Sequence, residues 1–149
     1  MMNIEQILEM WNRDSQIDEF KLDEATRDTA KLHSKYLELL TVHKLQLRRK
    51  EAEFNILLKD KWLYYNGKMT QADIDARGWP YDPFNGLSKP LKGEMDFYYD
   101  SDEHIVQAKT KIDYLKTVID TLEEIINTLR WRHQSIKNMI DWRRFESGA

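Results

Sequence analysis

Residues 105–140, IVQAKTKIDYLKTVIDTLEEIINTLRWRHQSIKNMI, decide how the rest of the chain must be arranged. Apolar residues recur here at alternating spacings of three and four, which is the pattern of a heptad ladder on one continuous helix. The ladder consists of Ile105, Ala108, Ile112, Leu115, Ile119, Leu122, Ile126, Leu129, His133, Ile136 and Ile140, and only His133 is polar. Such a helix runs for ~50 Å, so its apolar stripe needs an equally long partner.

The partner is expected in residues 20–65, which contain no glycine or proline and carry their own three-four apolar pattern. We therefore expect two long helices packed antiparallel. The stripe of 105–140 is wider than a two-stranded seam requires, because four further apolar residues lie beside it: Tyr114, Val118, Ile125 and Met139. This width predicts a third helix, supplied by another copy of the chain, unless the extra residues pack under the connecting segment of the same chain.

The remaining segments complete a single all-α domain over residues 1–149. The spacing of apolar residues predicts a short amphipathic helix within 1–15, and the last helix is expected over 102–146. Residues 66–101 contain all three prolines and four of the five glycines, so they are expected to form a connecting loop.

Three local features are expected within this loop. Thr70 is placed to cap one or two helical turns over Met69–Arg77. Trp79 and Phe84 are expected to pack back onto the helices or against a partner, because exposed aromatic side chains are unfavourable. Asp100, three residues before Glu103, is expected to cap the last long helix.

Composition excludes several classes of protein. No run of 18 apolar residues is present, so no membrane span is expected, and residues 1–10 do not read as a signal peptide. The absence of cysteine excludes disulfides and thiolate metal sites and suits a cytoplasmic protein. The four histidines lack metal-ligand spacing and no catalytic motif is present, so we expect neither an enzyme nor a cofactor.

The net charge is only -3, but basic and acidic residues are concentrated in separate segments of the chain. Residues 43–68 hold seven Lys or Arg against three acids, and residues 129–144 hold five bases against one acid. Residues 1–28 and 94–103 are acidic. Blocks of this kind often form nothing more than solvated faces.

The basic block after His43 has a second interpretation. On an ideal helix one narrow stripe carries Lys44, Arg48, Asn55, Lys59 and Trp62. Proteins that bind single-stranded nucleic acid without sequence preference combine cations for phosphates with aromatic faces for bases. Lys50 and Lys61 lie instead toward the apolar side of this helix.

Two segments resemble the UvsY family of T-even phage recombination mediators. Residues 58–67, LKDKWLYYNG, resemble the family region in which a basic Lys-Ala-Arg-Leu motif precedes a tyrosine pair and a turn with glycine. Residues 136–148, IKNMIDWRRFESG, are similar to the family ending, in which arginine precedes Phe-Glu-Ala-Gly. The likeness covers most of both long helices and fails between Thr70 and Met95.

The resemblance implies a mediator that binds single-stranded DNA (ssDNA). It implies loading of a RecA-like recombinase onto strands coated by single-strand-binding protein, and assembly into a ring of six or seven copies in the infected host cell. The ssDNA-binding residues predicted from the stripe and the resemblance are Lys44, Arg48, Lys59, Lys61, Trp62, Tyr64, Tyr65 and Lys68. The predicted oligomerisation residues are Ile112, Leu115, Ile119, Leu122, Ile126, Leu129, Ile136, Ile140 and Phe145.

Asp60 stands where the family motif has alanine and Trp62 where it has leucine, and Lys61 replaces the motif arginine but keeps its charge. Asp60 places a like charge near phosphates, whereas Trp62 offers a stacking surface. The alternative function is a structural helical adaptor without DNA affinity, in which the charge blocks set the pairing of protomers.

Overall fold

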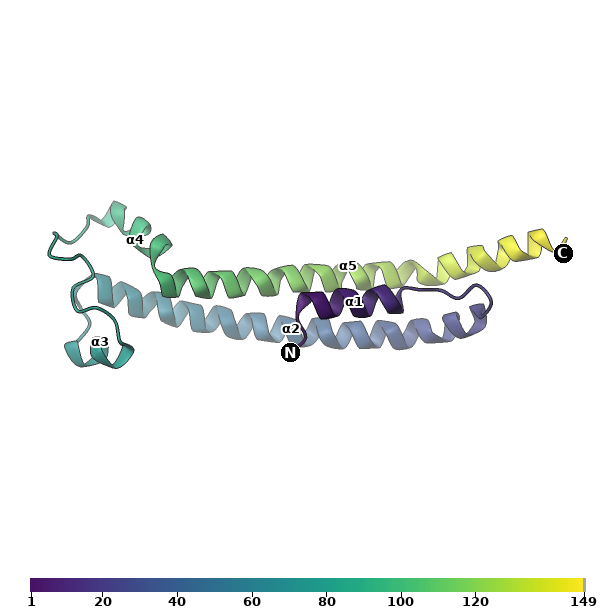
Figure 1. The fold of residues 1–149 in the computed structure, drawn as a ribbon, viewed down its shortest axis with the longest axis horizontal. Coiled ribbons are helices and arrows are strands. Elements are labelled where there is room, and N and C mark those ends of the chain that lie inside the picture. Colours follow the sequence, from purple (N-terminus) through teal and green to yellow (C-terminus); the bar gives the residue numbers. More distant parts are fainter. Residues whose placement is uncertain (149) are drawn as a thin grey trace. The chain divides into compact units, whose positions relative to one another are not determined.

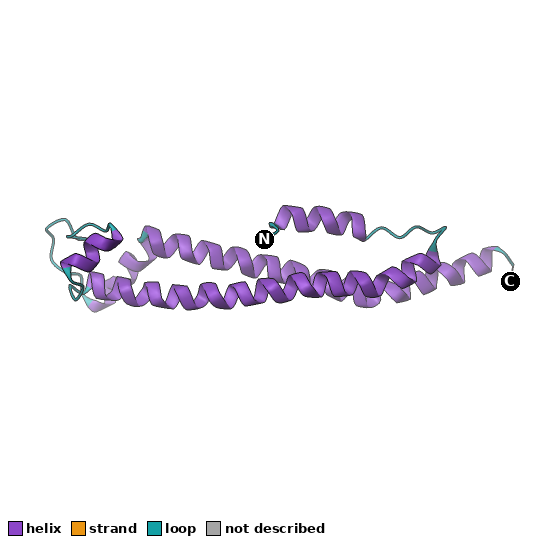
Figure 2. Cartoon of the chain, turned by 90° about the horizontal axis from the view of Figure 1, so that it is seen from below, coloured by secondary structure: helices purple, strands orange, loops and turns teal. Residues whose placement is uncertain are grey.

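In the computed structural model, which describes residues 1–148, every regular element is a helix (Figures 1 and 2). The elements are α1 (Ile4–Asp14), α2 (Leu22–Tyr65), α3 (Gln71–Arg77), the 3-10 helix η1 (Lys92–Glu94), α4 (Met95–Ser101) and α5 (Glu103–Glu146). The predicted all-α class with two long helices is confirmed. None of the described helices is long and apolar enough to cross a membrane.

The chain divides into two compact units, and both long helices contribute to each of them. Unit 1 comprises Met1–Gln46 and the residues from Leu115 onward, and unit 2 comprises Leu47–Tyr114. Within each unit the two long helices run antiparallel. In unit 1, Lys44 lies 3.3 Å from Glu123, and Leu22 packs with Ile136.

In unit 1 the third helix beside the two long ones is α1 of the same chain, and a helix from another copy stays a prediction. Ile7 of α1 is fully buried, and the Trp11 ring contacts the Tyr36 ring edge-on at a centroid distance of 5.4 Å. The Arg132 guanidinium of α5 donates hydrogen bonds of 3.1, 3.3 and 3.2 Å to the carbonyls of Asp14, Ser15 and Gln16. These bonds satisfy carbonyls that the end of α1 leaves without helical partners.

A second polar contact fastens α1 to α2. The Asp14 carboxylate accepts hydrogen bonds from Lys35 Nζ at 2.6 Å and from Tyr36 Oη at 2.9 Å. Burial raises the pKa of Asp14, but these two bonds outweigh burial and hold the pKa below its ordinary value. Burial and the hydrogen bond to Asp14 raise the pKa of Tyr36.

Most of the heptad ladder is buried within the protomer, and its assignment to an interface between copies stays a prediction. Six predicted oligomerisation residues are buried in unit 1: Leu115, Ile119, Leu122, Ile126, Leu129 and Ile136. Ile112 is buried in unit 2, and Ile140 is half-buried beside Leu22 and Ala25. Of the predicted set, only Phe145 is largely exposed. The ladder therefore binds α2 and α1 of its own chain.

The connection between the long helices contains more structure than the expected loop over 66–101. Gly67 follows α2 with φ +68°, a left-handed conformation that glycine adopts without strain. The predicted Thr70 cap is confirmed, because its hydroxyl accepts the Asp73 N–H at 3.2 Å at the start of α3. The expected Asp100 cap is wrong: Asp102 caps α5, accepting the Ile105 N–H at 3.0 Å. A short helix, α4, occupies the acidic segment before it.

Candidate nucleic-acid interface

Three of the predicted DNA-binding side chains lie exposed at the C-terminal end of α2 in unit 2. Lys59 and Lys68 are exposed, and 45% of the Trp62 surface is accessible. Lys68 Nζ lies 4.6 Å from the centroid of the Trp62 ring, so a cation rests directly on the aromatic surface. This cluster combines positive charge with an open aromatic face, the two features that bind an unpaired strand.

Three other residues that were predicted to contact a strand are buried in unit 2. Lys61 is only 2% exposed, and its Nζ lies 3.0 Å from Asp102 Oδ2 and 3.7 Å from the centroid of the Trp79 ring. Tyr64 donates a hydrogen bond to the carbonyl of Pro80, and Tyr65 donates one of 2.6 Å to Asp102. In this conformation these residues hold the site together from inside.

Asp102 is the centre of this buried network. Its two oxygens accept from Tyr65, from the backbone of Ile105 and from Lys61. Burial raises the pKa of Asp102, but these hydrogen bonds and the charge of Lys61 outweigh burial and lower the pKa. Burial and the bond to Asp102 raise the pKa of Tyr65. Asp102 therefore stays ionised and Tyr65 stays neutral at physiological pH.

Helix geometry explains why Lys59 is exposed and Lys61 is buried. Two residues apart on a helix, their side chains point to different faces, as the sequence predicted. Lys61 falls on the side that faces α5 and the connecting segment, whereas Lys59 faces solvent. The burial of Lys61 depends on Asp102 and Trp79, which lie far from it in sequence.

The other predicted cations lie further back along α2. Arg48 is exposed in unit 2. Lys44 belongs to unit 1, where it forms the 3.3 Å ion pair with Glu123, and both side chains are about half exposed. An ion pair this exposed contributes little stability, so Lys44 remains able to exchange Glu123 for another anion.

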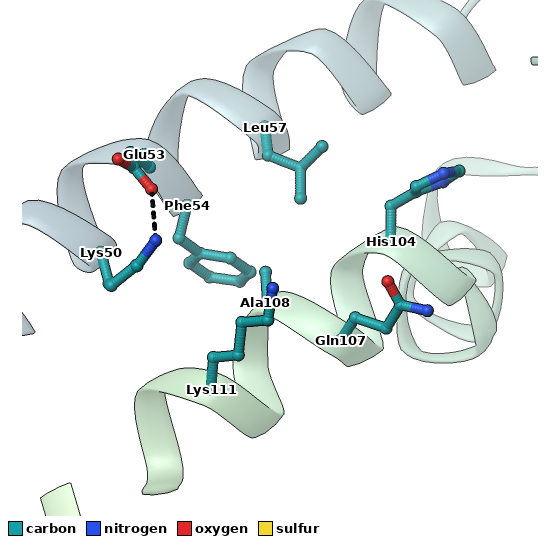
Figure 3. Close-up of a pocket in the computed structure, with 8 residues that line it drawn as sticks. All are labelled: Lys50, Glu53, Phe54, Leu57, His104, Gln107, Ala108 and Lys111. Atoms are coloured by element: carbon teal, nitrogen blue, oxygen red, sulfur yellow. Dashed lines mark hydrogen bonds and ion pairs between the residues drawn. The ribbon is translucent and has the colours of Figure 1, made fainter. Parts of the chain in front are cut away.

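Two of the surface pockets in unit 2 are lined by residues of the long helices. The first, with a volume of about 590 Å³, adjoins Trp62 and is lined by Trp62, Asn66, Lys89, Pro90, Leu91, Lys92, Met95, Asp96 and Tyr99. The second, of about 260 Å³, lies between α2 and α5 (Figure 3). In Figure 3, Phe54 and Leu57 from α2 point toward Ala108 of α5, with Lys50 and Lys111 at the rim.

No group of His, Asp or Glu in residues 1–148 is arranged to hold a metal ion.

Comparison with known proteins identifies the family. The family model described as "Recombination, repair and ssDNA binding protein UvsY" matches residues 10–149. The chain belongs to the UvsY family.

Relatives of the chain include the recombination protein uvsY of Enterobacteria phage T4, 26% identical over 147 residues that cover 99% of each chain. Among solved structures, the bacteriophage T4 recombination mediator protein UvsY in lattice type II gives a TM-score of 0.80 at 24% identity and covers 99% of both chains. Lattice type IV gives the same TM-score and identity, over 97% of this chain and 99% of that one. The resemblance to the UvsY family and the all-helical fold are confirmed.

The first departure from the UvsY motif, Asp60, is partly compensated in the structure. Asp60 Oδ2 lies 3.5 Å from a guanidinium nitrogen of Arg77 in α3, and both side chains are about one-third exposed. A paired aspartate repels a nearby phosphate less than an unpaired one. The second departure, Trp62, places an indole at an exposed position. Both departures are thus compatible with an anionic strand at this end of α2.

Exposed apolar side chains gather toward the C-terminal end of α5 in unit 1. The largest are Trp131, Trp142 and Phe145, and the rings of Trp142 and Phe145 stack with centroids 5.5 Å apart. Phe20 is also exposed and lies under the guanidinium of Arg143 at 5.5 Å. Exposed aromatic clusters of this kind mark protein interaction surfaces. In this UvsY-family chain they replace the buried ladder as the candidate surface for assembly.

The expectation that Trp79 and Phe84 pack back onto the helices is confirmed, because their rings contact those of Tyr64 and Tyr65 of α2. Sequence reasoning missed three other residues in this part of unit 2: Lys89, Lys92 and Asp102. It placed Asp102 only within an acidic segment. Lys89 and Lys92 flank Pro90 and Leu91, and this two-lysine turn was available as a signal. It was overlooked because only the folded chain places it beside Trp62.

Proposed function

We propose that this chain is an ssDNA-binding recombination mediator, which helps to load a RecA-like recombinase onto strands coated by single-strand-binding protein inside the infected host cell. The observation that supports this proposal most directly is the exposed cluster of Lys59, Trp62 and Lys68, which lies in and directly after the segment 58–67 that resembles the UvsY family. Two cations beside an open indole suit a backbone of phosphates that carries unpaired bases.

The proposed site differs in part from the one predicted from sequence. Lys59, Trp62 and Lys68 contact the strand, with Arg48 and Lys44 as further cations along α2. Lys61, Tyr64 and Tyr65 act by supporting the end of α2. A single site of this size binds weakly, so we further propose that several copies act together, in a ring of six or seven, to reach useful affinity. The exposed aromatic residues near the end of α5 support such an assembly.

Binding of a fluorescent poly-dT strand across a salt series tests this function. Each phosphate contact on a single strand contributes about 0.7 to the salt slope, so Lys59→Ala with Lys68→Ala lowers the slope by about 1.4 for each protomer engaged. The matched control is Lys31→Ala with Lys116→Ala, two exposed lysines of unit 1. Salt-sensitive binding that only the first variant weakens supports the mediator. If the folded protein does not bind the strand at low salt, the result supports the alternative function, a structural adaptor without DNA affinity.

A further inference from the structure

The pocket beside Trp62 is formed by three separate parts of unit 2. Trp62 lies at the end of α2 and Asn66 directly after it. Residues 89–92 belong to the connecting segment and the start of η1, and the three remaining residues belong to α4. Its volume of about 590 Å³ lies within the range of ~300–1,000 Å³ that is usual for small-ligand sites. The pocket is therefore large enough for one nucleobase with its sugar.

The segment that carries the two lysines of this pocket is held in place. Pro90 is buried, and so is Met95 at the start of α4. Between them, the Leu91 N–H donates to Glu94 Oε2 at 3.3 Å, and the Glu94 N–H donates to the Leu91 carbonyl at 2.9 Å. These contacts fix the turn, so Lys89 and Lys92 project from an anchored backbone.

Charge around the pocket favours an anion. Lys89 and Lys92 are exposed and line it, and Asp96 is the one acidic residue in its lining. Lys68 adds a third cation through its contact with Trp62. Exposed apolar surface from Leu91 and Trp62 lies among these cations. Cations interleaved with flat or apolar surface match a strand, in which phosphates alternate with bases.

We propose that this pocket is a nucleotide subsite, in which an unpaired base lies against Trp62 and the phosphates on either side of it contact Lys89 and Lys92. The inference rests on the proposed binding of ssDNA and extends it to the segment between Thr70 and Met95, where the resemblance to the family motif fails. The strand would thus pass from the end of α2 onto the turn before α4.

The test compares a dT oligonucleotide with an abasic strand of the same length, titrated against the full-length protein. Lys89→Ala with Lys92→Ala should weaken binding of both strands and lower the salt slope by about 1.4 per engaged protomer. Trp62→Ala should weaken dT binding on the order of tenfold while changing abasic binding little, because only a base can stack. Circular dichroism confirms that each variant is folded, and the Lys31→Ala, Lys116→Ala pair is the charge control.

The outcomes separate this proposal from the broader one. If Lys89→Ala with Lys92→Ala leaves the dT affinity and the salt slope unchanged, the subsite is overturned. If Lys59→Ala with Lys68→Ala weakens binding in the same experiment, the broader proposal of ssDNA binding still stands. Equal losses for dT and abasic strands in Trp62→Ala would also overturn it. If the unaltered protein binds neither strand at low salt, the proposed function and the subsite both fail.

Discussion

Lys61 is a charge kept almost wholly out of water, and its surroundings explain why that is tolerated. Asp102 neutralises it at 3.0 Å, and the Trp79 ring lies 3.7 Å away. The desolvation of two charges is offset only when geometry and further hydrogen bonds are good, and Tyr65 and the Ile105 N–H supply those bonds. The pair therefore holds the start of α5 on the end of α2 within unit 2.

Removal of Lys61 alone should destabilise the protein, because Asp102 would remain buried without its partner. We expect Lys61→Ala to lower the free energy of unfolding by about 3–5 kcal/mol. The double variant Lys61→Met with Asp102→Asn should recover most of this loss, since it buries no unpaired charge. Urea unfolding followed by circular dichroism measures both. A Lys61→Ala protein of unchanged stability would place Lys61 outside the buried network.

The lowered pKa of Asp102 links stability to pH. A carboxyl whose folded pKa is depressed contributes stability that is present above its unfolded pKa, about 3.8, and lost as pH falls through the folded pKa. We therefore expect urea stability to fall below about pH 4, and to fall less steeply in Asp102→Asn. The pKa of Asp14 is also lowered, so Asp14 is a second contributor to the loss of stability in acid, and it remains in Asp102→Asn. Equal slopes in the two proteins would assign the acid sensitivity to Asp14 and other carboxyls.

At the scale of the helix, the ladder on α5 serves the protomer itself. Val118 and Ile125, which broaden the stripe, are buried in the same unit as α1, α2 and the rest of the ladder. Arg132 bonds to the end of α1 from within this unit. Helices of the same chain thus cover Val118 and Ile125, whereas Tyr114 and Met139 remain 42% and 39% exposed.

Ile119→Asp should therefore unfold unit 1 rather than release folded protomers. The substituted carboxylate would be buried without a partner, which costs several kcal/mol against a total stability of about 5–15 kcal/mol. Asn127→Asp, an exposed position on the same helix, is the matched control. Loss of helical signal and lowered Tm in Ile119→Asp alone would agree with this account. A fully helical monomer would instead return Ile119 to an interface between copies.

The long helices could be predicted because their signals are local. The heptad spacing of α5, the lack of glycine and proline in α2 and the Thr70 cap all act within a few residues. The role of α1 and the burial of Lys61 could not be predicted, because each depends on contacts distant in sequence, such as Arg132 with Asp14 and Lys61 with Asp102. The position of Lys89 and Lys92 beside Trp62 could not be predicted for the same reason, because these residues lie far from Trp62 in sequence.

For the whole molecule, the proposed assembly would use surface that the protomer leaves open. The exposed rings of Trp142 and Phe145 provide such surface, whereas the ladder does not. We expect Trp142→Ser with Phe145→Ser to reduce the mass in solution while leaving helical content and Tm nearly unchanged. Leu45→Ser, at an exposed apolar residue of α2, is the control. Sedimentation velocity measures the mass, and an unaltered oligomer would locate the interface elsewhere.

In the proposed function, an unpaired strand binds the exposed end of α2, and the buried pair of Lys61 and Asp102 behind it only supports this site. The most direct measurement is poly-dT affinity across a salt series for two variants, Lys59→Ala with Lys68→Ala and Lys61→Met with Asp102→Asn. We predict a weaker affinity and a salt slope lower by about 1.4 per engaged protomer for the first, and near-normal values for the second. The opposite result would contradict this site: normal binding by Lys59→Ala with Lys68→Ala, and loss of binding by a folded Lys61→Met, Asp102→Asn protein.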